Sequence, residues 1–239
     1  MYKAHIVLEG ITPILLNPAT PELLADLEGQ VKRGKVKLSN EEKVAKIAAY
    51  YEENFGKLGL TRKYIDGNVV NAGRKVKADA RSNITASTKS TMLWALMELH
   101  AGNFLPFVPD IPPTDLQVDV QKGVNPNGGE AVVIARGRVD EWAIEFDVTV
   151  TDDALLPVTK LGDLLDIGGT AYGLGDFRPQ KGGSFGQYAA TITVTEKSKG
   201  HVSRVKIIDD IPDAKATPVV TQAEELVGAG VGSNGSDPS

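Results

Sequence analysis

The chain of 239 residues contains no cysteine, three histidines and few aromatic residues, which make up 6% of it. Without cysteine it forms neither disulfides nor thiolate metal sites, and a reducing compartment is the simplest expectation. No apolar run approaches the ~20 residues that span a bilayer. Residues 1–8 lack the long apolar segment of a signal peptide and predict a strand instead. We therefore expect a cytoplasmic protein that does not enter a membrane.

The sequence also lacks the usual residue patterns of catalysis and cofactor binding. The histidines, His5, His100 and His201, are scattered, and none lies at metal-ligand spacing from another. There is no Walker lysine motif. Gly173 and Gly175 follow a predicted helix, whereas the glycines of a dinucleotide fingerprint follow a strand. No histidine and serine form a recognisable nucleophilic pair. The sequence thus predicts no catalytic residue, no metal, no cofactor and no enzyme.

The net charge of −5 comes from one end of the chain. From Asp209 onward there are six acidic residues and one basic residue, so the preceding 208 residues are neutral overall. Beyond Ile211 the chain becomes rich in small residues, which bury too little apolar surface to offset the entropy of ordering. We expect a single α+β domain over residues 1–211 and a disordered acidic tail over residues 212–239.

Hydrophobic periodicity and capping residues predict mixed secondary structure. Apolar residues at helical spacing and good caps, such as Ser39 before two glutamates, predict helices over residues 20–33, 39–55, 66–77, 90–100 and 157–167. Period-two alternation predicts a hairpin formed by residues 116–120 and 131–138, and further strands over residues 2–8, 104–108, 142–150, 188–195 and 201–208. The expected fold is α+β, an antiparallel or mixed sheet with helices on one face, of an elaborated RRM or ferredoxin-like (RAMP-like) type.

A basic stretch between residues 72 and 91 is the first candidate binding segment. It contains one acid, Asp79, and several serine, threonine and asparagine residues. Five basic residues lie in it: Arg74, Lys75, Lys77, Arg81 and Lys89. A polar, positively charged segment suits contacts with phosphates, which position a nucleic-acid strand without reading its bases. The alternative interpretation is a solvated surface loop.

A glycine-rich segment over residues 162–186 is the second candidate, with eight glycines in 25 residues. Glycine lets a ligand approach main-chain N–H groups, so Gly173 and Gly175, with Arg178 and Lys181 nearby, are candidates to hold a phosphate backbone. Nearby aromatic residues would offer stacking faces to bases: Tyr172, Phe177, Phe185 and Tyr188. For Phe185 and Tyr188 a place in the core is the alternative. The alternative is a tight connection between a helix and a strand.

Three sequence blocks carry a resemblance to known proteins. Residues Val70–Lys77, Asp140–Trp142 and Gly173–Pro179, the last with Gly182–Gly186, resemble a family of uncharacterised proteins encoded by bacteriophages and prophage-like islands. The likeness covers Tyr2–Val194 and brings no assigned activity. The order of helix, glycine-rich loop and strand is also similar to that of RAMP proteins, the RRM-like subunits of CRISPR effectors. That likeness implies binding of RNA or single-stranded DNA by a repeated subunit, although the catalytic histidine of the RNA-cleaving members has no counterpart.

Together these observations predict a non-enzymatic protein of phage origin that binds single-stranded RNA or DNA in the host cytoplasm. The five basic residues would contact phosphates, and the glycine-rich loop would seat the backbone. A homo-oligomer or a larger complex is the expected assembly. Two alternatives remain at this point: a protein–protein interaction or assembly module that binds no nucleic acid, and an enzyme whose metal is held only by carboxylates.

Overall fold

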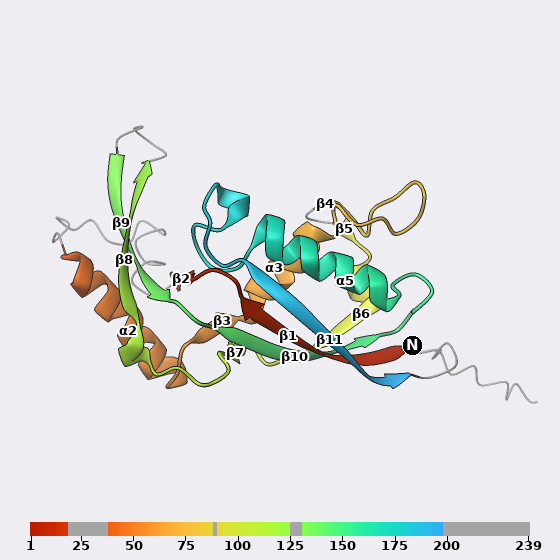
Figure 1. Cartoon of the computed structure of the whole chain (residues 1–239), viewed down its shortest axis with the longest axis horizontal. Helices are drawn as coiled ribbons and strands as arrows, with labels where there is room; N and C mark the ends of the chain where they lie inside the picture. The colour runs from red at the N-terminus through yellow and green to blue at the C-terminus, as the bar shows by residue number, and fades with distance from the viewer. Residues whose placement is uncertain (19–37, 88–89, 125–130, 198–239) are drawn as a thin grey trace, which may run out of the picture. The chain divides into compact units, whose positions relative to one another are not determined.

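The structure, a computed structural model, describes residues 1–18, 38–87, 90–124 and 131–197 (Figure 1). All of them belong to the first of two units of the chain, residues 1–202, and the second unit, residues 203–239, lies outside the described residues. The predicted helix 20–33, strand 201–208 and tail 212–239 lie outside them as well.

The main sheet is antiparallel and buries one face. Its four strands, in spatial order, are β11 (Tyr188–Lys197), β1 (Tyr2–Gly10), β10 (Ala143–Val150) and β6 (Met97–His100). Alternate residues of each strand are apolar, so they point to the same side. Ile6 of β1, for example, lies opposite Phe146 of β10 and Ile192 of β11. This side forms the hydrophobic core.

Two helices, α3 (Arg62–Ala72) and α5 (Val158–Ile167), cover that buried face (Figure 1). In α5 the leucines 161, 164 and 165 recur at helical spacing and are fully buried, which stabilises the fold by about 2 kcal/mol each. Along the chain the elements run β1, α3, β6, β10, α5, β11, a split β-α-β arrangement. The predicted α+β class, with helices on one face of a sheet, is confirmed.

A second, three-stranded sheet continues from the first. Its spatial order is β2 (Ile14–Leu16), β9 (Ala131–Val139) and β8 (Gln117–Val124). The predicted hairpin of β8 and β9 is confirmed, and α2 (Asn40–Phe55) packs against both strands. Ser39 and Glu42 form a capping box at the start of α2, and Gly56 ends it with φ +67°. This helix is therefore specified locally, as predicted.

The remaining elements are short. They are β3 (Gly59–Thr61), β4 (Thr85–Ser87), β5 (Ser90–Thr91), α4 (Leu93–Leu96), β7 (Phe104–Pro106), η1 (Pro113–Asp115), the π-helical turn η2 (Gly168–Tyr172) and η3 (Pro179–Lys181).

Two predicted helices differ from the structure. The helix predicted over residues 66–77 is α3, which begins at Arg62 and ends at Ala72. Its buried stripe includes Ile65, Val69 and Ala72, so packing begins before the expected cap at Asp66. Gly73 is the C-cap of α3, and a side chain at this position would collide with Thr85.

The helix predicted over residues 90–100 is wrong. The segment forms β5, the single turn α4 and then β6. Met97 and Leu99 are buried while Glu98 and His100 are exposed, and β6 pairs with β10. The apolar residues of this segment fit a helical spacing as well as an alternating one, and pairing with β10 decides between the two.

The open face of the main sheet is polar and largely acidic. Glu9, Glu145 and Asp147 are exposed there, and so is Glu98 at the edge strand β6. By register, the residues between the buried positions of these strands include no phenylalanine, tyrosine or tryptophan, and the rings among them are the imidazoles of His5 and His100. The imidazole of His5 is bonded to Asp147 and that of His100 to Thr149. A face of this kind repels phosphates and offers no large aromatic ring on which a base can stack.

Candidate nucleic-acid interface

A short, ordered hairpin follows α3 and carries most of the basic stretch; we call residues 73–83 the basic hairpin. Its tip is organised by Asp79, whose carboxylate accepts hydrogen bonds from the N–H groups of Arg81 and Ser82 at 2.7 and 2.8 Å and from the Ser82 hydroxyl at 2.7 Å. These bonds hold the pKa of Asp79 below its usual value, and the bond from the Ser82 hydroxyl has the largest effect. The one acid of the hairpin is thus occupied by its backbone.

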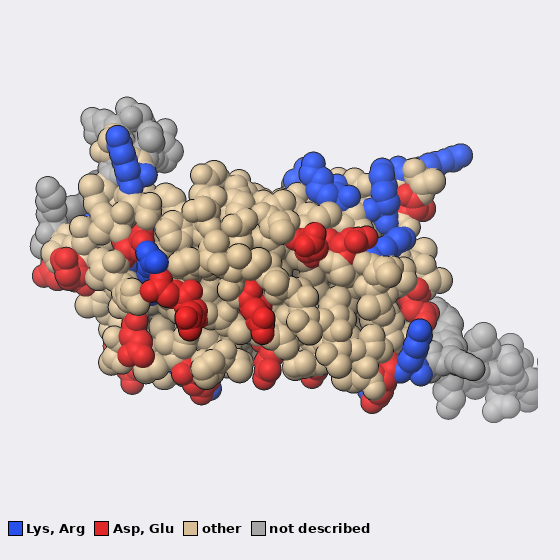
Figure 2. Space-filling view, viewed as in Figure 1, with Lys and Arg blue, Asp and Glu red and all other residues tan. Residues whose placement is uncertain are grey.

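The basic side chains of the basic hairpin have no acidic partner in the described structure. Arg74, Lys75, Lys77 and Arg81 are exposed, and none forms an ion pair with an acid that the structure describes. In Figure 2 basic side chains gather beside β4 and β5, at the upper right, whereas acidic ones lie along the lower side. Lys89 lies outside the described residues.

The glycine-rich loop is packed closely against β2. Gly173 and Gly175 are buried with φ +66° and +74°, which favours glycine. A Cβ atom at Gly175 would lie 2.6 Å from the Leu15 carbonyl oxygen. The N–H of Gly173 donates to the Gly168 carbonyl at 2.8 Å. The space beside Gly175 and the N–H of Gly173 are therefore used by the protein itself and not left for a phosphate.

Asn68 of α3 anchors the start of this loop. Its buried side chain donates to the carbonyls of Gly168 and Gly173 at 2.9 and 2.8 Å and accepts from the Tyr188 hydroxyl at 2.7 Å. Tyr188, one of the predicted stacking residues, lies in the core, and burial raises the pKa of its hydroxyl far above the usual value. Asn68 has no sequence signature that marks this role.

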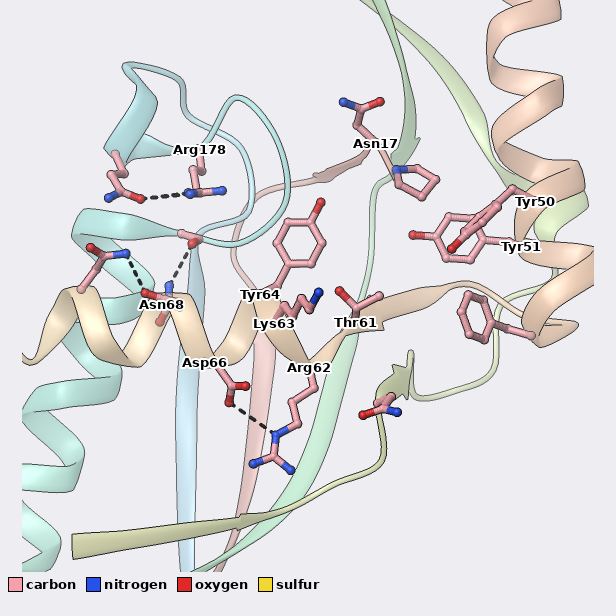
Figure 3. A pocket seen from close by; sticks show the side chains of 17 residues that line it. Asn17, Tyr50, Tyr51, Thr61, Arg62, Lys63, Tyr64, Asp66, Asn68 and Arg178 are labelled. Atoms are coloured by element: carbon pink, nitrogen blue, oxygen red, sulfur yellow. Dashed lines mark hydrogen bonds and ion pairs between the residues drawn. The ribbon is translucent and has the colours of Figure 1, made fainter. Parts of the chain in front are cut away.

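A pocket of about 900 Å³ lies between α2, α3 and the glycine-rich loop (Figure 3). We call it the α3 pocket, since residues 61–71 supply much of its lining. Tyr50 and Phe55 of α2, Tyr64 of α3, and Gly173 and Arg178 of the loop contribute to it. Its charged lining residues are three basic ones, Arg62, Lys63 and Arg178, and one acidic one, Asp66. The pocket is thus aromatic and positively charged.

Arg178 lies in this wall with neutral partners only. Its Nη1 donates to the Gly175 carbonyl at 2.8 Å, and Nε and Nη2 donate to Gln180 Oε1 at 3.2 and 3.1 Å. Among the described residues no carboxylate pairs with it. Lys181 is exposed in η3 and does not line the pocket. Of the predicted loop residues, Arg178 and Gly173 therefore come together here.

Tyr64 projects into the pocket between Arg178 and the tyrosines of α2 (Figure 3). Burial, and then the charge of Asp176, raise the pKa of Tyr64, against the opposing effect of Arg178 and Arg136. The phenol is therefore protonated at neutral pH, and its hydroxyl has no hydrogen-bond partner in the described structure. Neither Tyr50 nor Tyr64 was a sequence candidate, because the pocket joins segments that are far apart in the chain.

The described residues contain no group of three or more histidine, aspartate or glutamate side chains that could hold a metal ion. Within the same part of the chain, no helix has both the length and the apolar character that crossing a bilayer requires.

No protein-family model matches the sequence, and no curated protein matches it either.

Proposed function

We propose that this chain is a non-enzymatic protein of phage origin that binds single-stranded nucleic acid, with the basic hairpin as its main phosphate contact. The observation that carries the proposal is a set of four exposed arginine and lysine side chains that have no ion-pair partner in the described structure. They lie on a loop whose only acid, Asp79, is bonded to the loop itself. Cations of this kind release condensed counterions when they neutralise phosphates, and this release drives binding without regard to sequence. The phage origin rests on the resemblance of the sequence blocks alone.

The interface belongs on the helical side of the sheet. An RRM stacks bases on aromatic side chains of its open sheet face. The order of elements here supports an RRM-like or RAMP-like interpretation, but the corresponding face carries Glu145, Asp147 and Glu98 instead. The basic hairpin follows the C-terminal end of α3, and the α3 pocket runs along the same helix. A strand bound there would avoid the acidic face.

The test is fluorescence anisotropy of labelled single-stranded DNA and RNA at two salt concentrations. The variant R74Q/K75Q/K77Q removes three positive charges from the basic hairpin. The matched control, K46Q/K122Q/K197Q, removes three positive charges from exposed lysines elsewhere. We expect the hairpin variant to bind all sequences more weakly, with a salt slope smaller by about 2, since each phosphate contact on a single strand contributes about 0.7. Equal affinities for the two variants would refute the assignment.

A second candidate, self-association, is favoured by the edge strand β8. Val118, Val120 and Val133 share one face of the β8–β9 hairpin by register and are 41, 49 and 62% exposed. No described strand pairs with the outer edge of β8, and apolar residues beside such an edge invite pairing with another strand. Sedimentation of the protein without nucleic acid tests this: a dimer that V118T/V120T converts to monomer supports an assembly role, and a monomer at all concentrations excludes it.

A further inference from the structure

We infer that the α3 pocket is a second, separate site that binds one nucleotide, with its phosphate on Arg178 and its base against Tyr64 and Tyr50. The inference rests on the proposed function for the class of its ligand, because a strand held by the basic hairpin would offer nucleotides nearby. It requires no contact between that ligand and the hairpin.

The size and the charge of the pocket fit such a ligand. About 900 Å³ lies within the range of about 300–1,000 Å³ that small-molecule sites occupy. Arg62 is paired with Asp66 at 3.5 Å and also donates to the Ala101 carbonyl. Lys63 and Arg178 are the lining cations left without a carboxylate among the described residues. The pocket therefore attracts an anion.

Arg178 is oriented for a phosphate. Three of its N–H groups are donated to the Gly175 carbonyl and to Gln180, which fixes the plane of the guanidinium without neutralising its charge. A guanidinium has five N–H groups, so two remain for a ligand. An arginine held in this way binds a phosphate with little further loss of conformational freedom, and its planar fork matches two phosphate oxygens.

Tyr64 and Tyr50 supply aromatic surface and a hydrogen-bond donor. The Tyr64 hydroxyl is protonated at neutral pH and has no partner in the described structure, so it can donate to an anion. Tyr50 is held edge-on against Tyr51 and Phe55, with ring centroids 5.8 and 6.1 Å apart. A ring held in place within a positively charged pocket offers a face on which bases of any identity stack.

Amide side chains distinguish a nucleotide from a simple anion as the ligand. Asn17 and Asn103 line the same pocket, and Gln180, whose oxygen accepts from Arg178, adds its NH₂ group. The amide of an asparagine donates and accepts at once, which is the pattern that the edges of bases present. A free phosphate would use Arg178 and Lys63 and leave the aromatic and amide walls without a ligand contact. The composition of the lining thus favours a phosphate joined to a base.

Isothermal titration with adenosine 5′-monophosphate, adenosine and inorganic phosphate tests the inference, because these ligands offer the pocket a single nucleotide, or one part of it, without a strand. We expect saturable binding of the monophosphate, and weaker binding of adenosine and of phosphate. R178Q should weaken it about tenfold or more, since a hydrogen bond to a charged group is lost, and R178K should restore part of the affinity. Y64F should weaken it about threefold. K46Q/K122Q/K197Q is the control that should change nothing.

The outcomes separate this site from the proposed function. Binding of the monophosphate without binding of oligonucleotides would uphold the pocket and overturn the role of the basic hairpin. Oligonucleotide binding without saturable binding of millimolar monophosphate would overturn the pocket alone. Phosphate that binds as tightly as the monophosphate would overturn the assignment to a nucleotide. Thermal melting of each variant shows whether it is folded, and Y64F, which removes a single hydroxyl, decides the matter if R178Q does not fold.

Discussion

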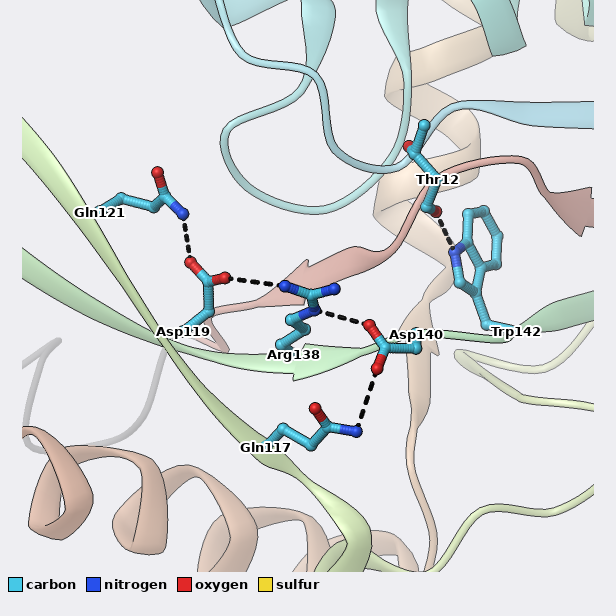
Figure 4. A network of polar contacts seen from close by, with 7 residues as sticks. All are labelled: Thr12, Gln117, Asp119, Gln121, Arg138, Asp140 and Trp142. Atoms are coloured by element: carbon cyan, nitrogen blue, oxygen red, sulfur yellow. Dashed lines mark hydrogen bonds and ion pairs between the residues drawn. The ribbon is translucent and has the colours of Figure 1, made fainter.

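Two regions of this molecule use arginine in opposite ways. In the β8–β9 hairpin, Arg138 lies between Asp119 at 3.4 Å and Asp140 at 2.6 Å, and Gln121 and Gln117 complete the network (Figure 4). Beside α3, Arg178 has only neutral partners. Both arginines are half-buried, so exposure does not separate them. They differ in that Arg138 has carboxylate partners and Arg178 has none among the described residues.

The fold already uses some of its cations to neutralise its own acids. Arg138 neutralises a buried carboxylate at the junction of the two sheets, where Trp142 also donates to the Thr12 carbonyl. Its charge is therefore part of the structure. Arg178 and the bases of the basic hairpin neutralise no acid in the described structure, so their charge is available to a ligand.

The largest expected effect tests whether the loop that carries Arg178 is a packed scaffold. In G186A the new Cβ would lie 1.9 Å from the Leu174 carbonyl oxygen, and φ is +69°. We expect a loss of about 3 kcal/mol or more in the free energy of unfolding. G182A is the matched control, because φ is +79° there but nothing lies near the new atom, and it should cost about 1 kcal/mol. Equal losses in urea denaturation would contradict the packed loop.

A smaller effect is expected at the anchor of the same loop. N68A leaves the Tyr188 hydroxyl and two carbonyls without their partner in the core. It should lower the free energy of unfolding by about 2–3 kcal/mol. Because Y188F removes one of the orphaned groups, the double variant N68A/Y188F should lose less than the sum of the single variants. Additive losses would show that Asn68 does not act through Tyr188.

The two arginines themselves should separate stability from binding. R138Q leaves Asp119 buried with Gln121 alone, so we expect a loss of about 1–2 kcal/mol, reduced by partial exposure. R178Q should lose about 1 kcal/mol or less, since it breaks no ion pair and removes only the hydrogen bonds to the Gly175 carbonyl and to Gln180. Nucleotide affinity should change in the opposite order. A variant R138Q that is fully stable but binds nucleotides poorly would reverse the comparison.

The smallest effect concerns Asp79 at the tip of the basic hairpin. Its pKa is lowered by the hydroxyl of Ser82 and the N–H groups of Arg81 and Ser82. A depressed pKa means that the ordering is fully present above the ordinary aspartate pKa and is lost as pH falls through the lower folded value. In an NMR titration, the amide resonances of Arg81 and Ser82 should therefore move together with a midpoint below the usual range of aspartate. A midpoint at the ordinary value would contradict the ordered tip.

Much of the fold could be predicted where local chemistry decides it. The caps of α2 and the alternating residues of β10 each specify an element without help from the rest of the chain. The segment that ends in β6 could not be assigned locally, because its apolar residues fit a helical spacing as well as an alternating one and only pairing with β10 separates them.

The candidate site divides in the same way. The basic hairpin is a cluster of charges in one segment, so composition alone found it. The α3 pocket joins Tyr50, Tyr64 and Arg178 from three segments, and of these only Arg178 carried a local signal, its place beside glycines. The glycines of this segment allow either a ligand cradle or a tight connection, and Gly173 and Gly175 are packed against the protein's own atoms. Composition shows that glycine is needed at a position but not what lies next to it.

The most direct test of the central claim is photo-cross-linking of a single-stranded oligonucleotide that carries 4-thiouridine, followed by mapping of the cross-linked peptides. If free cations mark the interface, cross-links should fall on the basic hairpin and on the segments that line the α3 pocket. Cross-links concentrated on β6 and β10, at the acidic open face of the main sheet, would contradict the account.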